Sequence, residues 1–391
     1  MDREILLQIA EKYKTPLYIF DMDEFSKRAK LVKDAFGEEV HLCYSIKANP
    51  FLLYKMPEYF SNFEVCSPGE LTICEKMKVD MKKVIFSGVN KTLPDVERAI
   101  DDGVGILTAE SLLHVELIQK AAEEREKTVS VLLRLTGGSQ FGMDKEVLMD
   151  IIDRREKYPN LKIVGIHFFT GTQKKKLSVI DKELTKLDDF SKMLEFEHGF
   201  HVERIEYGTG LAVDYFSEDA DKLEEERLQE VAPLIQKMGE KYHLTIEMGR
   251  FFAAPCGNYI TKVIDVKTNK GYHYAICDGG MNQLKYDGQM KGMQTPPICV
   301  LTNEEKGENV YTLCGSLCTT SDVLATIHTG KLEPGDLLSF GRTGAYSVME
   351  GMAVFLSREM PAVVCYSKEQ GTVLVRDFIN TDLFNTPNYI N

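Results

Sequence analysis

The stretch His41-Leu42-Cys43-Tyr44-Ser45-Ile46-Lys47-Ala48-Asn49-Pro50 decides how the rest of this 391-residue chain can be interpreted. Its apolar and aromatic first half predicts a buried strand, which Asn49-Pro50 ends because proline cannot donate to a β-ladder. Lys47 closes that strand, where a buried ammonium costs free energy unless it is paired. The lysine could reach solvent at the rim, or it could be an amine that forms a Schiff base with an aldehyde cofactor. The stretch alone leaves both interpretations open.

Short apolar runs recur over the first two thirds of the chain, with helical patterns such as 110–125 and 223–241 between them. The runs lie at 41–47, 63–66, 83–87, 104–108, 129–135, 162–169, 204–207 and 244–247. Strands that are apolar throughout are typical of parallel sheets covered by helices on both faces. The alternation therefore predicts an α/β fold in which eight strands and their helices form a (β/α)₈ barrel.

The rhythm changes after about residue 258 to short strands without long helices between them. The expected strands lie at 258–266, 272–277, 297–302, 309–313, 337–340, 351–356, 362–366 and 372–376, and a further strand-like segment lies at 15–21. We expect residues 26–257 to form the barrel, and residues 1–25 and 258–391 to form an all-β domain.

The composition excludes several classes of function. A net charge of −13 does not provide the basic footprint of a nucleic-acid-binding protein, and it repels anionic membrane surfaces. No apolar run approaches membrane-spanning length, and Met1-Asp2-Arg3-Glu4 does not begin a secretory signal. The nine cysteines lack zinc-ligand spacing, which indicates reduced thiols in a cytoplasm and no metal site.

Polar and glycine residues follow several of the predicted barrel strands. They are Lys47, Arg134, His167, Gly208-Thr209-Gly210 and Glu247-Met248-Gly249-Arg250. The chemistry of a (β/α)₈ barrel collects at the face where its strands end, so these groups are expected to converge on one mouth.

A lysine, a glycine-rich turn and an acid at one mouth indicate a specific cofactor. Gly208-Thr209-Gly210 lets backbone N–H groups approach a phosphate, and Arg250 suits a phosphate dianion, although a simple turn and a Glu247–Arg250 ion pair are the alternatives. Together these groups describe pyridoxal 5'-phosphate. Lys47 would hold its aldehyde as an internal aldimine, and Glu247 would keep its pyridine nitrogen protonated.

Seven motifs then carry a resemblance to a known family. They are Tyr44-Ser45-Ile46-Lys47-Ala48-Asn49-Pro50, Phe141-Gly142, Gly208-Thr209-Gly210, Glu247-Met248-Gly249-Arg250, Cys277-Asp278-Gly279-Gly280-Met281-Asn282, Gly315-Ser316-Leu317-Cys318-Thr319-Thr320-Ser321-Asp322 and Gly344-Ala345-Tyr346. In this order they resemble the cofactor-lysine, FG, glycine-loop, EPGR, D-[AG]-G-M-N, G-P-x-C-[ED]-S-x-D and GAY motifs of the alanine-racemase-type (fold III) pyridoxal phosphate decarboxylases, the diaminopimelate and ornithine decarboxylase family. The resemblance covers nearly the whole chain.

The resemblance implies a decarboxylase that is a head-to-tail homodimer with shared active sites, to whose interface the β-domain contributes. Cys318 of the partner subunit would protonate the carbanion of the quinonoid after CO₂ leaves, and Tyr346 of the partner subunit would reach the cofactor phosphate. The resemblance also implies cofactor contacts from Arg134, His167, Phe169, Thr172, Met248 and Gly249, and substrate contacts from Arg250, Lys285, Tyr286 and Thr319.

Three departures from the family pattern bear on the substrate. Phe169 stands where the family stacks a histidine on the cofactor, Thr319 replaces the acid that follows the catalytic cysteine, and Gln283-Leu284-Lys285-Tyr286 replaces an arginine-bearing stretch. Loss of a distal acid and arginine removes charged contacts on which substrate selection depends. We therefore expect the substrate to be an α-amino acid other than free meso-diaminopimelate.

An acidic or acylated side chain is one possibility, since the family includes members that act on glutamyl groups tethered to a carrier protein. The run Lys174-Lys175-Lys176 could attract an acidic carrier, or it could be an exposed helix start. The alternatives to a decarboxylase are an amino-acid racemase with the same cofactor, against which Glu247 argues, and a catalytically inactive regulatory homologue, against which Lys47 and Cys318 argue.

Overall fold

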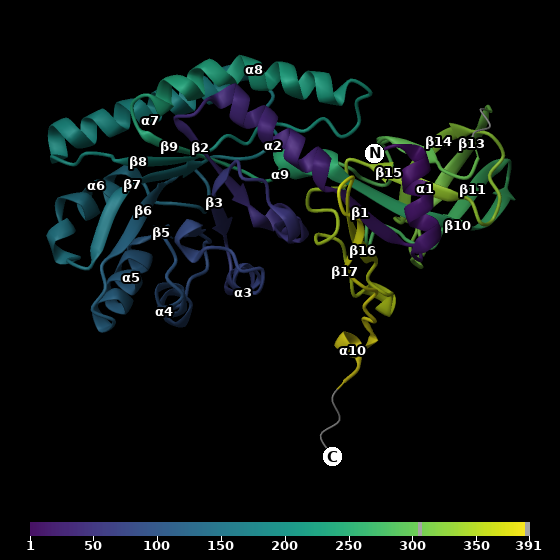
Figure 1. The fold of residues 1–391 in the computed structure, drawn as a ribbon, viewed down its shortest axis with the longest axis horizontal. Coiled ribbons are helices and arrows are strands. Elements are labelled where there is room, and N and C mark those ends of the chain that lie inside the picture. Colours follow the sequence, from purple (N-terminus) through teal and green to yellow (C-terminus); the bar gives the residue numbers. More distant parts are fainter. Residues whose placement is uncertain (304–306, 388–391) are drawn as a thin grey trace. The chain divides into compact units, whose positions relative to one another are not determined.

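The computed structural model describes residues 1–303 and 307–387, and the chain forms two compact units (Figure 1). The barrel unit comprises Arg28–Val213 and Lys222–Phe251. The β-unit comprises Met1–Lys27, Asp214–Asp221 and the chain from Phe252 onward. The short segment Asp214–Asp221 therefore groups with the β-unit, although it lies inside the range 26–257 that the sequence analysis assigned to the barrel.

Eight parallel strands close the barrel in sequence order, which confirms the predicted fold class. They are β2 (Val40–Ser45), β3 (Phe60–Val65), β4 (Val84–Phe86), β5 (Ile106–Ala109), β6 (Val129–Leu135), β7 (Leu161–Phe169), β8 (Arg204–Gly208) and β9 (His243–Met248). Each of the eight predicted apolar runs contains or overlaps one of them. The strands are short and almost wholly buried, as expected when both faces are covered.

Helices form the outer layer of the barrel, with α7 and α8 on one side and α3, α4 and α5 on the opposite side (Figure 1). The α-helices between Met22 and Ala253 are α2 (Met22–Phe36), α3 (Pro68–Lys76), α4 (Leu93–Asp101), α5 (Leu112–Glu124), α6 (Lys145–Asp153), α7 (Leu177–His198), α8 (Ala220–Gly239) and α9 (Arg250–Ala253). Serine caps begin α3 and α5: Ser67 accepts the N–H of Glu70, and Ser111 accepts the N–H of His114. These caps fix the points at which the chain leaves the barrel mouth.

The strand that was predicted to end at Lys47 ends two residues earlier. β2 stops at Ser45, and Lys47 lies in a 3₁₀ turn over Ile46–Ala48. Asn49 stabilises this turn because its carbonyl accepts the Tyr44 hydroxyl at 2.9 Å and its side chain accepts the N–H of Phe51 at 3.1 Å. Lys47 is therefore presented by a hydrogen-bonded turn at the carboxyl end of the strand.

The β-unit contains one mixed sheet in which β1 is central, pairing with β10 on one side and β16 on the other. Its strands are β1 (Leu17–Asp21), β10 (Gly257–Asn269), β11 (Tyr272–Cys277), β12 (Ile298–Val300), β13 (Asn309–Cys314), β14 (Val323–Thr329), β15 (Leu337–Gly341), β16 (Ala362–Ser367) and β17 (Gly371–Arg376), with helices α1 (Arg3–Lys12) and α10 (Asp382–Asn385). β14 was not predicted from the sequence, and the strand predicted at 351–356 is wrong. That segment is a loop leading into a 3₁₀ turn, and its alternating apolar residues Met352, Val354 and Leu356 are exposed.

Across the described ranges, no helix combines the length and apolar character needed to cross a membrane. Within the same ranges, no group of three or more histidine, cysteine or acidic side chains is arranged to hold a metal ion.

Candidate active site

The Lys47 ammonium lies between two carboxylates at the mouth of the barrel. Its Nζ forms an ion pair with Glu64 and lies 3.2 Å from Oε1 of Glu247. It also lies 3.5 Å from Sγ of Cys66. The Lys47 side chain is 35% exposed, whereas both carboxylates are buried. Lys47 is therefore not a lysine that simply extends into solvent: its amine is held inside an acidic pocket and remains accessible.

Glu247 is held as an anion by three neighbours. Ser45 donates its hydroxyl to Oε1 at 2.9 Å, and Nε2 of His167 lies 3.0 Å from Oε2. Burial acts to raise the pKa of Glu247, but the Lys47 charge and the contacts from His167 and Ser45 outweigh it and hold that pKa well below its usual range. An anionic carboxylate at this position can stabilise a protonated ring nitrogen.

Glu64 and Cys66, which the sequence analysis did not select, complete the surroundings of Lys47. The Cys66 thiol donates to Oε1 of Glu64 at 2.9 Å. Burial and then the Glu64 charge raise the pKa of the Cys66 thiol well above its usual value, so the thiol stays protonated. The sequence signal that singled out Lys47 was also present for Glu64, because Glu64 is a charged residue near the end of a strand that is otherwise buried.

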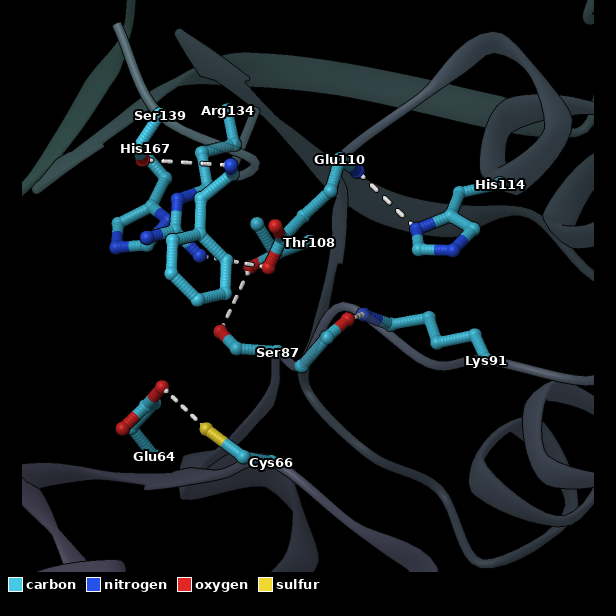
Figure 2. A network of polar contacts seen from close by, with 12 residues as sticks. Glu64, Cys66, Ser87, Lys91, Thr108, Glu110, His114, Arg134, Ser139 and His167 are labelled. Atoms are coloured by element: carbon cyan, nitrogen blue, oxygen red, sulfur yellow. Dashed lines mark hydrogen bonds and ion pairs between the residues drawn. The ribbon is translucent and has the colours of Figure 1, made fainter. Parts of the chain in front are cut away.

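Arg134, near the end of β6, is held by Glu110, which directly follows β5 (Figure 2), and by Phe141 in the loop after β6. Its Nη1 donates to Oε1 of Glu110 at 2.7 Å, and its guanidinium lies 4.8 Å from the centroid of the Phe141 ring. The loop carrying Phe141 returns to the strand because Gly142 adopts a positive φ of 77° and a Cβ there would meet the Arg134 carbonyl oxygen at 2.9 Å. This explains the Phe141-Gly142 pair as a support for Arg134.

The glycine-rich turn after β8 lies tightly against the loop after β7. A Cβ at Gly208 would lie 2.5 Å from Cδ2 of Phe169, and one at Gly210 would lie 2.0 Å from the Gly171 carbonyl oxygen. Lys174 donates its backbone N–H to the Gly210 carbonyl at 2.8 Å and joins the two loops. Thr209 in this turn is buried, whereas Thr172 is exposed. The glycines therefore let the two loops pack at backbone distance, and the backbone N–H groups of a glycine-rich turn can bind a phosphate.

The first lysine of the run at 174–176 belongs to the barrel wall. Its ammonium pairs with Oε2 of Glu183 at 2.7 Å, and its side chain is only 8% exposed. The same ammonium lies 5.9 Å from the centroid of the Phe169 ring. Lys175 and Lys176 are exposed. The interpretation of the run as an exposed helix start therefore does not apply to Lys174.

The remaining barrel residues selected from the sequence lie at the end of β9. Met248 and Gly249 are buried, and Arg250 is half-buried at the start of α9. A Cβ at Gly249 would lie 2.7 Å from Cβ of Ala48, so the turn that carries Lys47 packs directly on this glycine.

The Cys318 loop, residues 315–322, follows β13 in the β-unit. Asp322 holds it by accepting the N–H groups of Met281 and Leu317, each at 2.8 Å. Cys318 and Thr319 are exposed and line a cavity of about 860 Å³. The loop thus presents the thiol from a rigid base within this unit.

The other selected residues of the β-unit are already engaged in it. Lys285 forms an ion pair with Glu350 at 3.0 Å, and both side chains are about half exposed. Tyr286 is buried and donates its hydroxyl to the Gly341 carbonyl at 2.7 Å. Tyr346 is half-buried with a positive φ of 66°. Contact of these three with a cofactor or substrate stays a prediction.

The barrel mouth fits pyridoxal phosphate. It offers a lysine amine and an anionic carboxylate at one mouth, a glycine-rich turn that follows β8, and a buried His167 whose Nδ1 has no hydrogen-bond partner among the described residues. These features define a site for a cofactor that carries an aldehyde, a basic ring nitrogen and a phosphate.

Comparison with known proteins gives the family. Residues 22–254 match the family model described as pyridoxal-dependent decarboxylase, pyridoxal binding domain. The L-glutamyl-[BtrI acyl-carrier protein] decarboxylase of Niallia circulans is 27% identical, with 92% of this chain and 91% of that protein aligned. The diaminopimelate decarboxylase of Methanocaldococcus jannaschii is 26% identical over 95% of this chain and 90% of that protein. Its structure in complex with L-lysine matches with a TM-score of 0.84 at 25% identity, covering 99% of this chain and 94% of that chain.

The chain belongs to the pyridoxal-dependent decarboxylase family. It is an amino-acid decarboxylase that uses pyridoxal phosphate, as the sequence analysis predicted.

Proposed function

We propose that this enzyme removes the α-carboxylate of an amino acid or amino-acyl group other than free meso-diaminopimelate. The observation that carries the proposal is that the Lys47 amine lies at the same mouth as a carboxylate, Glu247, whose pKa is held well below its usual range. Bound there, pyridoxal phosphate supplies an electron sink for the electron pair left when the bond to the carboxylate breaks.

Each residue at the mouth then has a role. Lys47 holds the cofactor aldehyde, and Glu247 keeps a proton on the pyridine nitrogen, which a racemase of this fold would not require. The Phe169 ring would be the side chain that stacks on the cofactor. The turn at 208–210 and Arg250 would bind the phosphate, with the remaining selected barrel residues Arg134, His167, Thr172, Met248 and Gly249 around the cofactor. Tyr346 of the partner subunit would reach the cofactor phosphate.

The proposal includes a homodimer, in which Cys318 of the partner subunit donates a proton to the carbon that has lost its carboxylate. Support comes from the loop geometry: Asp322 and two backbone N–H groups hold a loop whose thiol is exposed. We also propose a cytoplasmic location, because none of the nine cysteines, all of which lie in the described ranges, forms a disulfide.

The proposed substrate follows from the residues that replace the family's distal acid and arginine. Thr319 is neutral, and Lys285 already has a carboxylate partner in Glu350. Neither offers the charge pair that recognises a distal amino-acid head group. The relative from Niallia circulans, whose name states a carrier-bound glutamyl substrate, supports a glutamyl group tethered to a carrier protein as the first candidate.

The test is CO₂ release by purified enzyme with added pyridoxal phosphate. The panel contains meso-diaminopimelate, lysine, ornithine, arginine, glutamate and glutamate tethered to the BtrI carrier. We expect release from a member other than diaminopimelate, and loss of both release and the visible absorbance of bound cofactor in Lys47→Ala. Turnover of diaminopimelate at about 1–10³ s⁻¹ would refute the substrate assignment. Racemisation without CO₂ release would refute the reaction.

A further inference from the structure

Glu206 is a carboxylate buried inside the barrel without a hydrogen-bond partner. It is 0% exposed, and neither Oε1 nor Oε2 is hydrogen-bonded to the described protein. Its neighbour Tyr207 points outward, since its hydroxyl donates to Glu183 of α7. Side chains alternate along a strand, so Glu206 points into the barrel. Leaving such a group unsatisfied is expensive, so the position calls for an explanation.

His167 stands directly opposite Glu206. The two residues are register partners on the adjacent parallel strands β7 and β8. One ring nitrogen of His167, Nε2, faces Glu247 at 3.0 Å, and the other, Nδ1, is buried without a hydrogen-bond partner in the part of the chain that the structure describes. The unsatisfied nitrogen and the unsatisfied carboxylate therefore belong to neighbouring side chains on the same face of the sheet.

The charged and titratable groups that face Glu206 come from five strands: His167 on β7, Glu247 on β9, Arg204 on β8, Glu64 on β3 and Cys43 on β2. Arg204 does not form an ion pair with Glu206. Its Nη2 donates instead to Asn62 at 2.7 Å and to Thr245 at 2.8 Å.

The charges in this cluster balance only if one extra proton is present. Three carboxylates, Glu64, Glu206 and Glu247, stand against two cations, Lys47 and Arg204. Burial raises the pKa of Glu206 to about 7, with His167 and Arg204 opposing the rise and Glu247 and Glu64 adding to it. Glu247 has its pKa shifted in the opposite direction. When the pKa values of two neighbouring acids are shifted in opposite directions, the acid with the raised pKa carries the proton and the acid with the lowered pKa stays an anion.

We propose that Glu206 is a positioning residue that shares one proton with Nδ1 of His167 and thereby keeps the N–H on Nε2 directed at Glu247. The two groups are not in direct hydrogen-bonding contact, so one bridging water would join them, as buried waters commonly do. When Glu206 is neutral, its O–H donates to the water and the water donates to Nδ1. When Glu206 is ionised, the Nδ1–H of the imidazolium donates to the water and the water donates to the carboxylate. Glu247 accepts an N–H in both forms and remains a carboxylate. The importance of this for catalysis rests on the proposed function, in which Glu247 faces the pyridine nitrogen.

The test is ¹⁵N NMR of the full chain labelled at histidine, recorded from pH 5.5 to 9 with and without pyridoxal phosphate. The chain has eight histidines, and His167→Asn assigns the signal of His167. In the wild type, we expect N–H on Nε2 throughout and a change in the Nδ1 signal as Glu206, whose pKa is raised to about 7, titrates. Glu206→Gln keeps a donor for Nδ1 but cannot ionise, so the tautomer should persist and this change should vanish.

Glu206→Met fills a similar volume without a donor. It should populate the tautomer with N–H on Nδ1, which removes the donor facing Glu247. In the Glu206→Met enzyme with bound cofactor, we expect kcat to fall by roughly ten- to a hundredfold with little change in KM. Glu206→Gln should keep kcat close to the wild-type value. A His167 spectrum that is the same in the wild type and both variants would overturn the proposal. Because the spectra are also recorded without cofactor, failure to find a substrate would leave this test intact.

Discussion

Gly249→Ala should displace the turn that carries Lys47. A Cβ at position 249 would lie 2.7 Å from Cβ of Ala48, 3.0 Å from the Ser45 carbonyl oxygen and 3.2 Å from Cβ of Ser45. Carbon atoms pack at about 3.5–4.0 Å, so the turn would have to withdraw by roughly 1 Å. The three contacted atoms are backbone or Cβ atoms, and no side-chain rotation can relieve them.

The displacement should reduce stability and activity together. Overpacking of this kind costs about 1–3 kcal/mol, and a shift of about 1 Å in a reacting group can cost about a hundredfold in rate. We expect the variant without cofactor to unfold at lower urea concentration, to bind pyridoxal phosphate more weakly, and to lose about a hundredfold in kcat for CO₂ release.

Gly69→Ala is the matched control, because the nearest atom to a Cβ there is Oγ of Ser67 at an ordinary 3.7 Å and Gly69 lies within α3. It should not lower the free energy of unfolding, and it should raise it by up to about 1 kcal/mol because alanine favours the helix. Normal cofactor binding and turnover in Gly249→Ala would refute the view that this glycine positions the lysine turn.

Three further predictions concern buried charges elsewhere in the molecule. Glu183→Gln leaves the Lys174 ammonium buried without its anion, which should cost about 3–5 kcal/mol in urea unfolding, whereas adding Lys174→Met should recover most of the loss. Burial lowers the pKa of Lys91 to about 8, so between pH 8 and 10.5 the unfolded state binds more protons than the folded state. The free energy of unfolding of the wild type should therefore rise by up to about 3 kcal/mol over this pH range, and Lys91→Met should lack the rise. Equal slopes of unfolding free energy against pH in the two proteins would contradict this. Asp322→Asn weakens a charged acceptor of the Leu317 N–H, and amide exchange there should accelerate about ten- to a hundredfold; unchanged exchange would show that Asp322 does not hold the loop.

Much of the barrel site could be predicted from the sequence, because it follows from the hydrophobic pattern of the strands and from the positions at which they end. Runs that are apolar on both faces require covering helices, and parallel strands end at one face of the barrel. These two rules place Lys47, His167 and Glu247 at one mouth before any contact is known, and the structure brings the three together.

Pairings across the barrel could not be predicted in the same way, because they depend on strand stagger and loop path. Lys174 has two lysine neighbours in sequence, yet it is buried against Glu183 because its loop folds over the glycine turn. The alternation of Met352, Val354 and Leu356 predicted a strand, but positive φ values at Leu356 and Ser357 turn that segment instead. β14 was missed because Thr326, His328 and Thr329 interrupt its apolar residues.

The two carboxylates beside Lys47 differ in how they are held, and this difference assigns them separate tasks. Glu247 has donors that do not depend on the lysine, since Ser45 and His167 contact its two oxygens. Glu64 has the lysine and the Cys66 thiol as its hydrogen-bonding partners among the described residues. An amine that attacks an aldehyde must give up its protons. Both carboxylates would lose the lysine cation in that change, but Glu247 would keep its contacts with Ser45 and His167, whereas Glu64 would keep only the Cys66 thiol among the described residues. Glu247 is therefore the better supported anion of the two, and Glu64 responds more strongly to the state of the lysine.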